Sequence, residues 1–116
     1  ASNAYLFNGT NGYIHIPNST SLQLPASTNA ITQTAWVYLK GVSDYAPVTM
    51  KSDKPDNQFM YRMDLNTYSL YANYNNWFTG SRATYTFSLN TWYFVATTFD
   101  GSYAKFYING ALVATS

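Results

Sequence analysis

The sequence has no cysteine, few charged residues and no long apolar run, and each of these absences excludes a class of protein. Without cysteine there is no disulfide, no thiolate nucleophile and no cysteine-based zinc site, so packing and sheet hydrogen bonds must hold the fold. Charged residues make up only 9% of the chain and the formal net charge is +1, whereas nucleic acids are bound by clustered Lys and Arg. We therefore expect no nucleic-acid partner and, because no run is long enough to span a bilayer, no insertion into a membrane.

Glutamate is also absent, which bears on catalysis. Glycoside hydrolysis needs two carboxyl groups about 5 to 9.5 Å apart, one ionised and one protonated. All five acidic residues are aspartates, and only Asp64 is predicted to project from a sheet face. His15, the one histidine, has no nucleophile motif beside it. We expect a non-catalytic protein that hydrolyses no polysaccharide.

Aromatic residues are abundant, with 12 Tyr, 7 Phe and 3 Trp among 116 residues, and Asn, Ser and Thr supply most of the remaining polarity. Aromatic side chains favour strands, and such a composition predicts a secreted or cell-surface β-protein. A chain of this length forms one domain, residues 1–116.

Short stretches of alternating apolar and polar residues run through the whole chain and predict an all-β, antiparallel fold. Asp100-Gly101 and Asn109-Gly110 are typical of tight hairpin turns. The predicted strands are residues 4–8, 12–16, 30–39, 46–51, 58–65, 69–74, 82–88, 92–100, 104–109 and 111–115.

The alternation also sorts side chains onto two sheet faces, because neighbouring residues of a strand point to opposite sides. If the strands at 58–65, 69–74 and 82–88 are neighbours, their face away from the core is polar and carries one aromatic ring. The predicted members of this face are Arg62, Asp64, Tyr71, Asn73, Arg82, Thr84 and Thr86. An ion pair between Arg62 and Asp64 is the alternative interpretation of those two residues.

The segment 74–80 is a polar, amide-rich loop that contains Trp77. Aromatic rings stack on the apolar C–H faces of sugars, while Asn, Arg and Asp side chains pair with sugar hydroxyls. We therefore predict a carbohydrate-binding site. Its residues are Arg62, Asp64, Tyr71, Asn73, Tyr74, Asn76 and Trp77.

Four blocks resemble laminin-G-like jelly rolls of the concanavalin A-like superfamily, and they occur in the family's order. They are residues 4–17, 31–37 with its Ala-Trp-Val step, 92–101 and 106–113. The resemblance implies an antiparallel β-sandwich of the concanavalin A-like jelly-roll type that binds carbohydrate or mediates adhesion. It also predicts that Trp36 and Trp92 are structural. The expected core residues are Phe7, Ile14, Trp36, Val37, Tyr61, Val95, Phe99 and Tyr107, more than half of which should be buried.

Related modules often hold calcium, and two features bear on a calcium site here. Asn8 replaces an aspartate that is frequent in the family's opening, which weakens a site at that position. Asp53 and Asp56, between two predicted strands, supply the hard oxygen ligands that calcium prefers. A solvated loop is the alternative interpretation of these two residues.

The family usually continues with further strands beyond the last matching hairpin, whereas this sequence stops at Ser116. We expect a sandwich that lacks those C-terminal strands and leaves an open edge, which recruits a strand from a second copy or from a separate chain fragment. The alternative is a compact monomer in which 111–115 lies beside the N-terminal strands. The predicted function is a carbohydrate-binding or adhesion module; the alternative is a structural module that assembles through its open edge.

Overall fold

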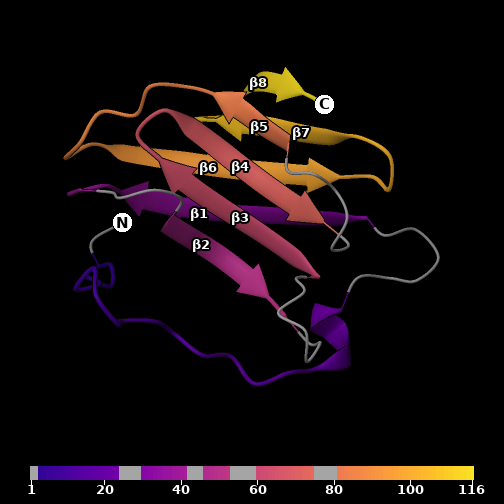
Figure 1. The fold of residues 1–116 in the computed structure, drawn as a ribbon, viewed down its shortest axis with the longest axis horizontal. Coiled ribbons are helices and arrows are strands. Elements are labelled where there is room, and N and C mark those ends of the chain that lie inside the picture. Colours follow the sequence, from indigo (N-terminus) through magenta and orange to yellow (C-terminus); the bar gives the residue numbers. More distant parts are fainter. Residues whose placement is uncertain (1–2, 24–29, 42–45, 53–59, 75–80) are drawn as a thin grey trace.

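The computed structural model describes residues 3–23, 30–41, 46–52, 60–74 and 81–116, and its regular elements are strands apart from one short helix. The helix is a single 3-10 turn, η1 (Thr20–Leu22). Figure 1 shows two sheets lying one over the other, with the strands of one crossing those of the other at an angle. This arrangement confirms the predicted all-β sandwich.

The two sheets are built from strands that pair antiparallel with every neighbour. Sheet A has the order β1-β6-β7-β8, and sheet B has the order β2-β3-β4-β5. In sheet A the strands are β1 (Ile31–Tyr38), β6 (Trp92–Phe99), β7 (Ala104–Ile108) and β8 (Ala111–Thr115). In sheet B they are β2 (Ala46–Lys51), β3 (Tyr61–Asn66), β4 (Ser69–Tyr74) and β5 (Ser81–Thr84).

The predicted Asn-Gly turn closes the β7–β8 hairpin. Asn109 has φ 51° and Gly110 has φ 83°, and positive φ at both central residues is what a tight hairpin turn of this kind needs. After β5 the chain stays alongside the β3–β4 turn, where the N–H groups of Tyr85 and Phe87 donate to the carbonyls of Tyr68 and Thr67, both at 2.9 Å.

The core lies between the inner faces of the two sheets and follows the alternation of each strand. Leu70 and Ala72 of β4 are buried, whereas Tyr71 and Asn73 between and beyond them are not fully enclosed. The fully or almost fully buried apolar residues are Met63, Leu65, Leu70, Ala72, Tyr74, Ala83, Phe87, Tyr93, Val95, Phe99, Ala104, Phe106 and Ile108. Removing this surface from water is the main force that holds the sheets together.

The prediction of strands at 4–8 and 12–16 is wrong, because residues 3–18 form no strand. A strand exists only where its backbone groups find a partner. No hydrogen bond joins the backbone of residues 3–18 to the backbone of any other described residue.

The core prediction is also wrong in its main claim. Of the eight expected residues only Val95 and Phe99 are buried, while Val37, Tyr61 and Tyr107 are half-buried. Phe7 and Ile14 are exposed because their segment packs against neither sheet, and Trp36 is exposed because it points outward. Adjacent residues of a strand cannot share a face, so Trp36 and Val37 could not both have been core.

Candidate functional site

The outer face of sheet B carries the polar residues that the sequence predicted there, except Thr86, which lies beyond the end of β5. In the register of β3 with β4, Arg62 lies opposite Asn73 and Asp64 lies opposite Tyr71. Exposed Arg82 of β5 lies opposite Tyr71 on its other side. The structure therefore brings Arg62, Asp64, Tyr71 and Asn73 together on one face.

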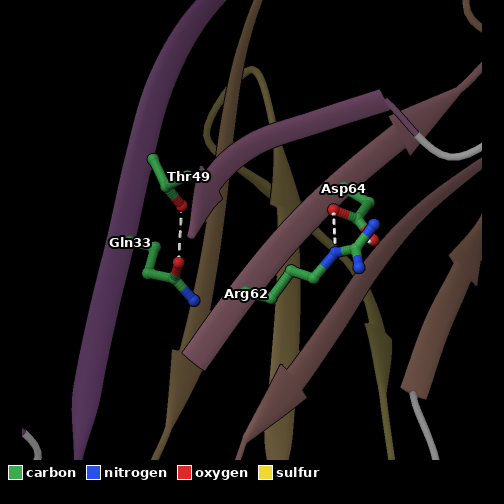
Figure 2. Close-up of polar contacts among 4 residues, drawn as sticks. All are labelled: Gln33, Thr49, Arg62 and Asp64. Atoms are coloured by element: carbon green, nitrogen blue, oxygen red, sulfur yellow. Dashed lines mark hydrogen bonds and ion pairs between the residues drawn. The ribbon is translucent and has the colours of Figure 1, made fainter. Parts of the chain in front are cut away.

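Arg62 and Asp64 form an ion pair on this face (Figure 2). The Arg62 Nε–H donates to the Asp64 carboxylate at 2.6 Å, and only 2% of the Asp64 side chain is exposed against 23% of Arg62. Burial raises the pKa of Asp64 above its ordinary value, while the hydrogen bond and the charge of Arg62 lower it. The alternative interpretation, an ion pair on one face, is confirmed, and the carboxylate is used within the protein.

Tyr74 lies on the other side of β4, in the core, and is no surface contact for a ligand. Its ring stacks on Phe99 with centroids 4.6 Å apart, and its hydroxyl donates to Thr97 Oγ1 at 2.9 Å. Burial raises the pKa of Tyr74, so the hydroxyl stays protonated and donates. Its position follows from the alternation that also buries Leu70 and Ala72.

The other predicted site residues, Asn76, Trp77, Asp53 and Asp56, lie outside the described residues. Their roles in sugar and calcium binding stay predictions. Within the described ranges, no three His, Asp or Glu side chains gather closely enough to hold a metal ion.

The outer face of sheet A carries a second feature, a set of exposed aromatic rings. Trp36 packs against Phe94 with ring centroids 5.2 Å apart, and Tyr38 packs against Trp92 at 5.3 Å, both pairs tilted. The exposed fractions are 64% for Trp36, 44% for Trp92 and 39% for Tyr38. Large rings left in water across two neighbouring strands form an apolar platform of the kind that marks a binding surface.

A shallow hollow of about 370 Å³ lies at the other end of β1 and β6, where hydroxyl and charged groups line the surface together with the rings of Phe99, Tyr103 and Tyr107. Its lining residues with a polar side-chain group are Thr32, Thr98, Asp100, Tyr103, Lys105 and Tyr107. The Asp100 carboxylate accepts hydrogen bonds from the N–H groups of Tyr103 at 2.7 Å and Ser102 at 2.8 Å, and these bonds lower the pKa of Asp100. Asp100 is therefore ionised at neutral pH, close to the positively charged Lys105.

Comparison with known families places the chain in one of them. A laminin-G family model of the concanavalin A-like lectin/glucanases superfamily matches residues 8–116. The chain belongs to this superfamily. A search of the curated proteins found no match.

The superfamily name covers both lectins and glucanases, so the carboxylates of this member decide what chemistry is open to it. The two described acids lie in different parts of the sandwich, Asp64 in β3 of sheet B and Asp100 after β6 of sheet A. Asp64 is tied to Arg62, and Asp100 caps its own turn. Among the described residues this superfamily member thus shows no facing pair of carboxylates for glycoside hydrolysis. None of its described helices is both long and apolar enough to cross a membrane.

Sequence reasoning missed the aromatic face of this concanavalin A-like sandwich because it took Trp36 and Trp92 as structural residues. The signal lay in the alternation of 31–38, where Ile31, Gln33, Ala35 and Val37 share one face and Thr32, Thr34, Trp36 and Tyr38 share the other. Which face turns inward depends on the opposite sheet, and a single strand does not show it.

Proposed function

We propose that the protein is a non-catalytic carbohydrate-binding module of a secreted or surface protein, and that the outer face of sheet A is its binding surface. The observation that carries the proposal is the exposure of Trp36, Tyr38 and Trp92 on one side of a regular sheet. Rings in this setting offer stacking surface for sugar C–H faces at low conformational cost, because they are held by their strands.

The polar end of the same face supplies what a stacked sugar still needs. Residues Thr32 and Tyr38 lie six positions apart on β1, so about 20 Å of sheet separates the hollow from the far rings. Along this strip a sugar chain would meet rings first and then the hydroxyls of Thr32 and Thr98 and the charges of Asp100 and Lys105. Apolar lining with a few placed polar groups is the usual make-up of a small-ligand site.

Sheet B remains a second proposed surface, as the sequence predicted. What favours it is the position of Tyr71 between Asp64 and exposed Arg82, with Asn73 beside Arg62. The buried Asn73 Oδ1 has no hydrogen-bond partner among the residues that the structure describes. Because Asp64 is used by Arg62 and Tyr74 is buried, this proposed surface now depends on Tyr71, Asn73, Asn76 and Trp77.

Binding to an array of neutral and acidic glycans, followed by titration with the best ligand, tests the proposal. Trp36→Ala should weaken binding at least about tenfold, since it removes the more exposed of the two tryptophans on this face. Tyr68→Ala is the matched control, because Tyr68 is 71% exposed but lies in the β3–β4 turn and not on β1 or β6. Loss of binding in Tyr71→Ala or Trp77→Ala but not in Trp36→Ala would move the site to sheet B. No binding to any glycan would refute the function.

A further inference from the structure

The N-terminal segment, residues 3–17, has the side chains of a buried strand but none of its contacts. Its apolar residues stand in solvent, with Tyr5 and Tyr13 each 81% exposed and Ile14 and Ile16 more than half exposed. The two arms of the segment meet at Asn8, whose Oδ1 accepts from the N–H groups of Thr10, Asn11 and Gly12 at 2.9 to 3.0 Å. The turn at residues 8–12 is therefore well formed, whereas residues 3–7 and 13–17 make no backbone hydrogen bond to any described residue.

What holds this end of the chain to the sandwich lies beyond the segment itself. Lys51 Nζ donates to Asn18 Oδ1 at 2.6 Å, and the Tyr61 hydroxyl donates to the Leu22 carbonyl at 2.9 Å. In Figure 1 the segment runs along the side of the molecule where β1 and β2 form the sheet edges. Its backbone nevertheless makes no hydrogen bond to the described part of either strand.

The edge of sheet A on this side is β1, and no described residue pairs with its outer edge. Natural edge strands are protected by charges, proline, bulges or short length. β2 has Pro47, Lys51 and a register shift, and β5 has four residues and Arg82. β1, by contrast, is eight residues long, without charge, proline or register shift. A long, regular, uncharged edge is a template for another strand.

We propose that β1 pairs with the N-terminal segment of a second copy of this chain, and that two copies exchange their segments reciprocally. Each chain carries both halves of the contact, an unpaired strand-like segment and an unpaired edge, which is the condition for a symmetric exchanged dimer. Neither half contains Asp, Glu, Lys or Arg, so no charge is desolvated when they meet. The added strand covers its own apolar side chains and satisfies the backbone of both partners.

Light scattering over a broad concentration range gives the first test. We expect the mass to double with concentration, and to do so equally at low and high salt, because the contact is uncharged. Ile14→Asp should raise the dissociation constant at least about tenfold. Leu89→Asp is the matched control, since Leu89 is also exposed but lies outside the segment. A single-chain mass at every concentration would overturn the proposal.

Cross-linking locates the contact, because the chain has no cysteine of its own. A copy carrying Ile14→Cys is mixed with a differently tagged copy carrying Thr34→Cys in β1, and a short bis-maleimide is added. We expect a mixed cross-linked dimer, and much less of it when the second copy carries Thr84→Cys, an exposed threonine on the edge strand β5. Equal yields from the two pairs, or a doubly substituted chain that cross-links only within a monomer, would contradict exchange between copies.

Circular dichroism and urea unfolding of Ile14→Asp show whether the sandwich itself is intact. Because Ile14 is more than half exposed and belongs to neither sheet, the variant should unfold at the same urea concentration as the parent chain when both are monomeric.

Discussion

Replacing Arg62 with methionine would leave the Asp64 carboxylate without its ion-pair partner, and the structure sets the expected cost. Breaking a fully buried pair costs about 3 to 5 kcal/mol. Since 23% of the Arg62 side chain remains in solvent, we expect the free energy of unfolding to fall by about 2 to 3 kcal/mol at neutral pH. Arg82→Met, an exposed arginine on the same sheet, should change it by less than about 0.5 kcal/mol.

The pH dependence of this loss distinguishes an ion pair from simple packing. Burial raises the pKa of Asp64, so the folded chain binds this proton more tightly than the unfolded chain does. The stability from this group is therefore present below the unfolded pKa and is lost as pH rises through the folded pKa. Without Arg62 the pKa of Asp64 rises further, because the hydrogen bond and the charge that lower it are gone.

Urea unfolding followed by tryptophan fluorescence, from about pH 7 to about pH 4, measures the effect. The deficit of Arg62→Met should shrink as the solution becomes acidic, and adding Asp64→Asn should recover much of it at neutral pH. A deficit that stays constant with pH, or one no larger than that of Arg82→Met, would refute the reasoning.

Two further pairs of substitutions test the core and one turn. Tyr74→Phe keeps the stack on Phe99 but loses the hydrogen bond to Thr97, so the free energy of unfolding in urea should fall by about 1 kcal/mol. Tyr74→Ala loses the stack as well and should lower it by about 4 kcal/mol. Equal losses in the two variants would contradict the separate contributions of ring and hydroxyl. Gly110→Ala should cost about 1 kcal/mol because φ is +83° at this position, although nothing lies within 4 Å of the added methyl group. Gly41→Ala places a methyl group in equally open space at a position without a positive φ, so it should leave the free energy of unfolding unchanged. Thermal unfolding of both glycine variants measures the difference.

Local patterns predicted the parts of the fold that depend on neighbouring residues alone. The alternation in 69–74 placed Leu70 and Ala72 inside and Tyr71 and Asn73 outside, and the structure confirms this. Asn109-Gly110 predicted its hairpin because positive φ is a property of those two residues. The position of Arg62 beside Asp64 likewise follows from a spacing of two residues on one strand.

Features that depend on distant partners were not readable from the sequence. Residues 12–16 alternate like a strand, but whether they form one depends on a partner that the pattern does not name. Asp64 is buried although it shares its sheet face with half-buried Arg62, and the alternation of β3 alone does not predict this difference. The outward orientation of Trp36 depends on where sheet B lies, since both faces of β1 carry apolar residues.

Two hydrogen bonds between the sheets, one buried and one partly buried, connect this internal architecture to the proposed binding face. Apolar packing is non-directional and leaves the two sheets free to shift, whereas a buried hydrogen bond tolerates little displacement. Thr49 Oγ1 of sheet B donates to Gln33 Oε1 of sheet A at 2.5 Å, and the Tyr74 hydroxyl of sheet B donates to Thr97 of sheet A (Figure 2 shows the first). Gln33 and Thr97 lie on β1 and β6, the strands whose outer faces carry the rings. The pairing of β1 with β6 sets the spacing of the rings, and the two bonds hold both strands against sheet B, so the proposed stacking surface is backed by a fixed second layer.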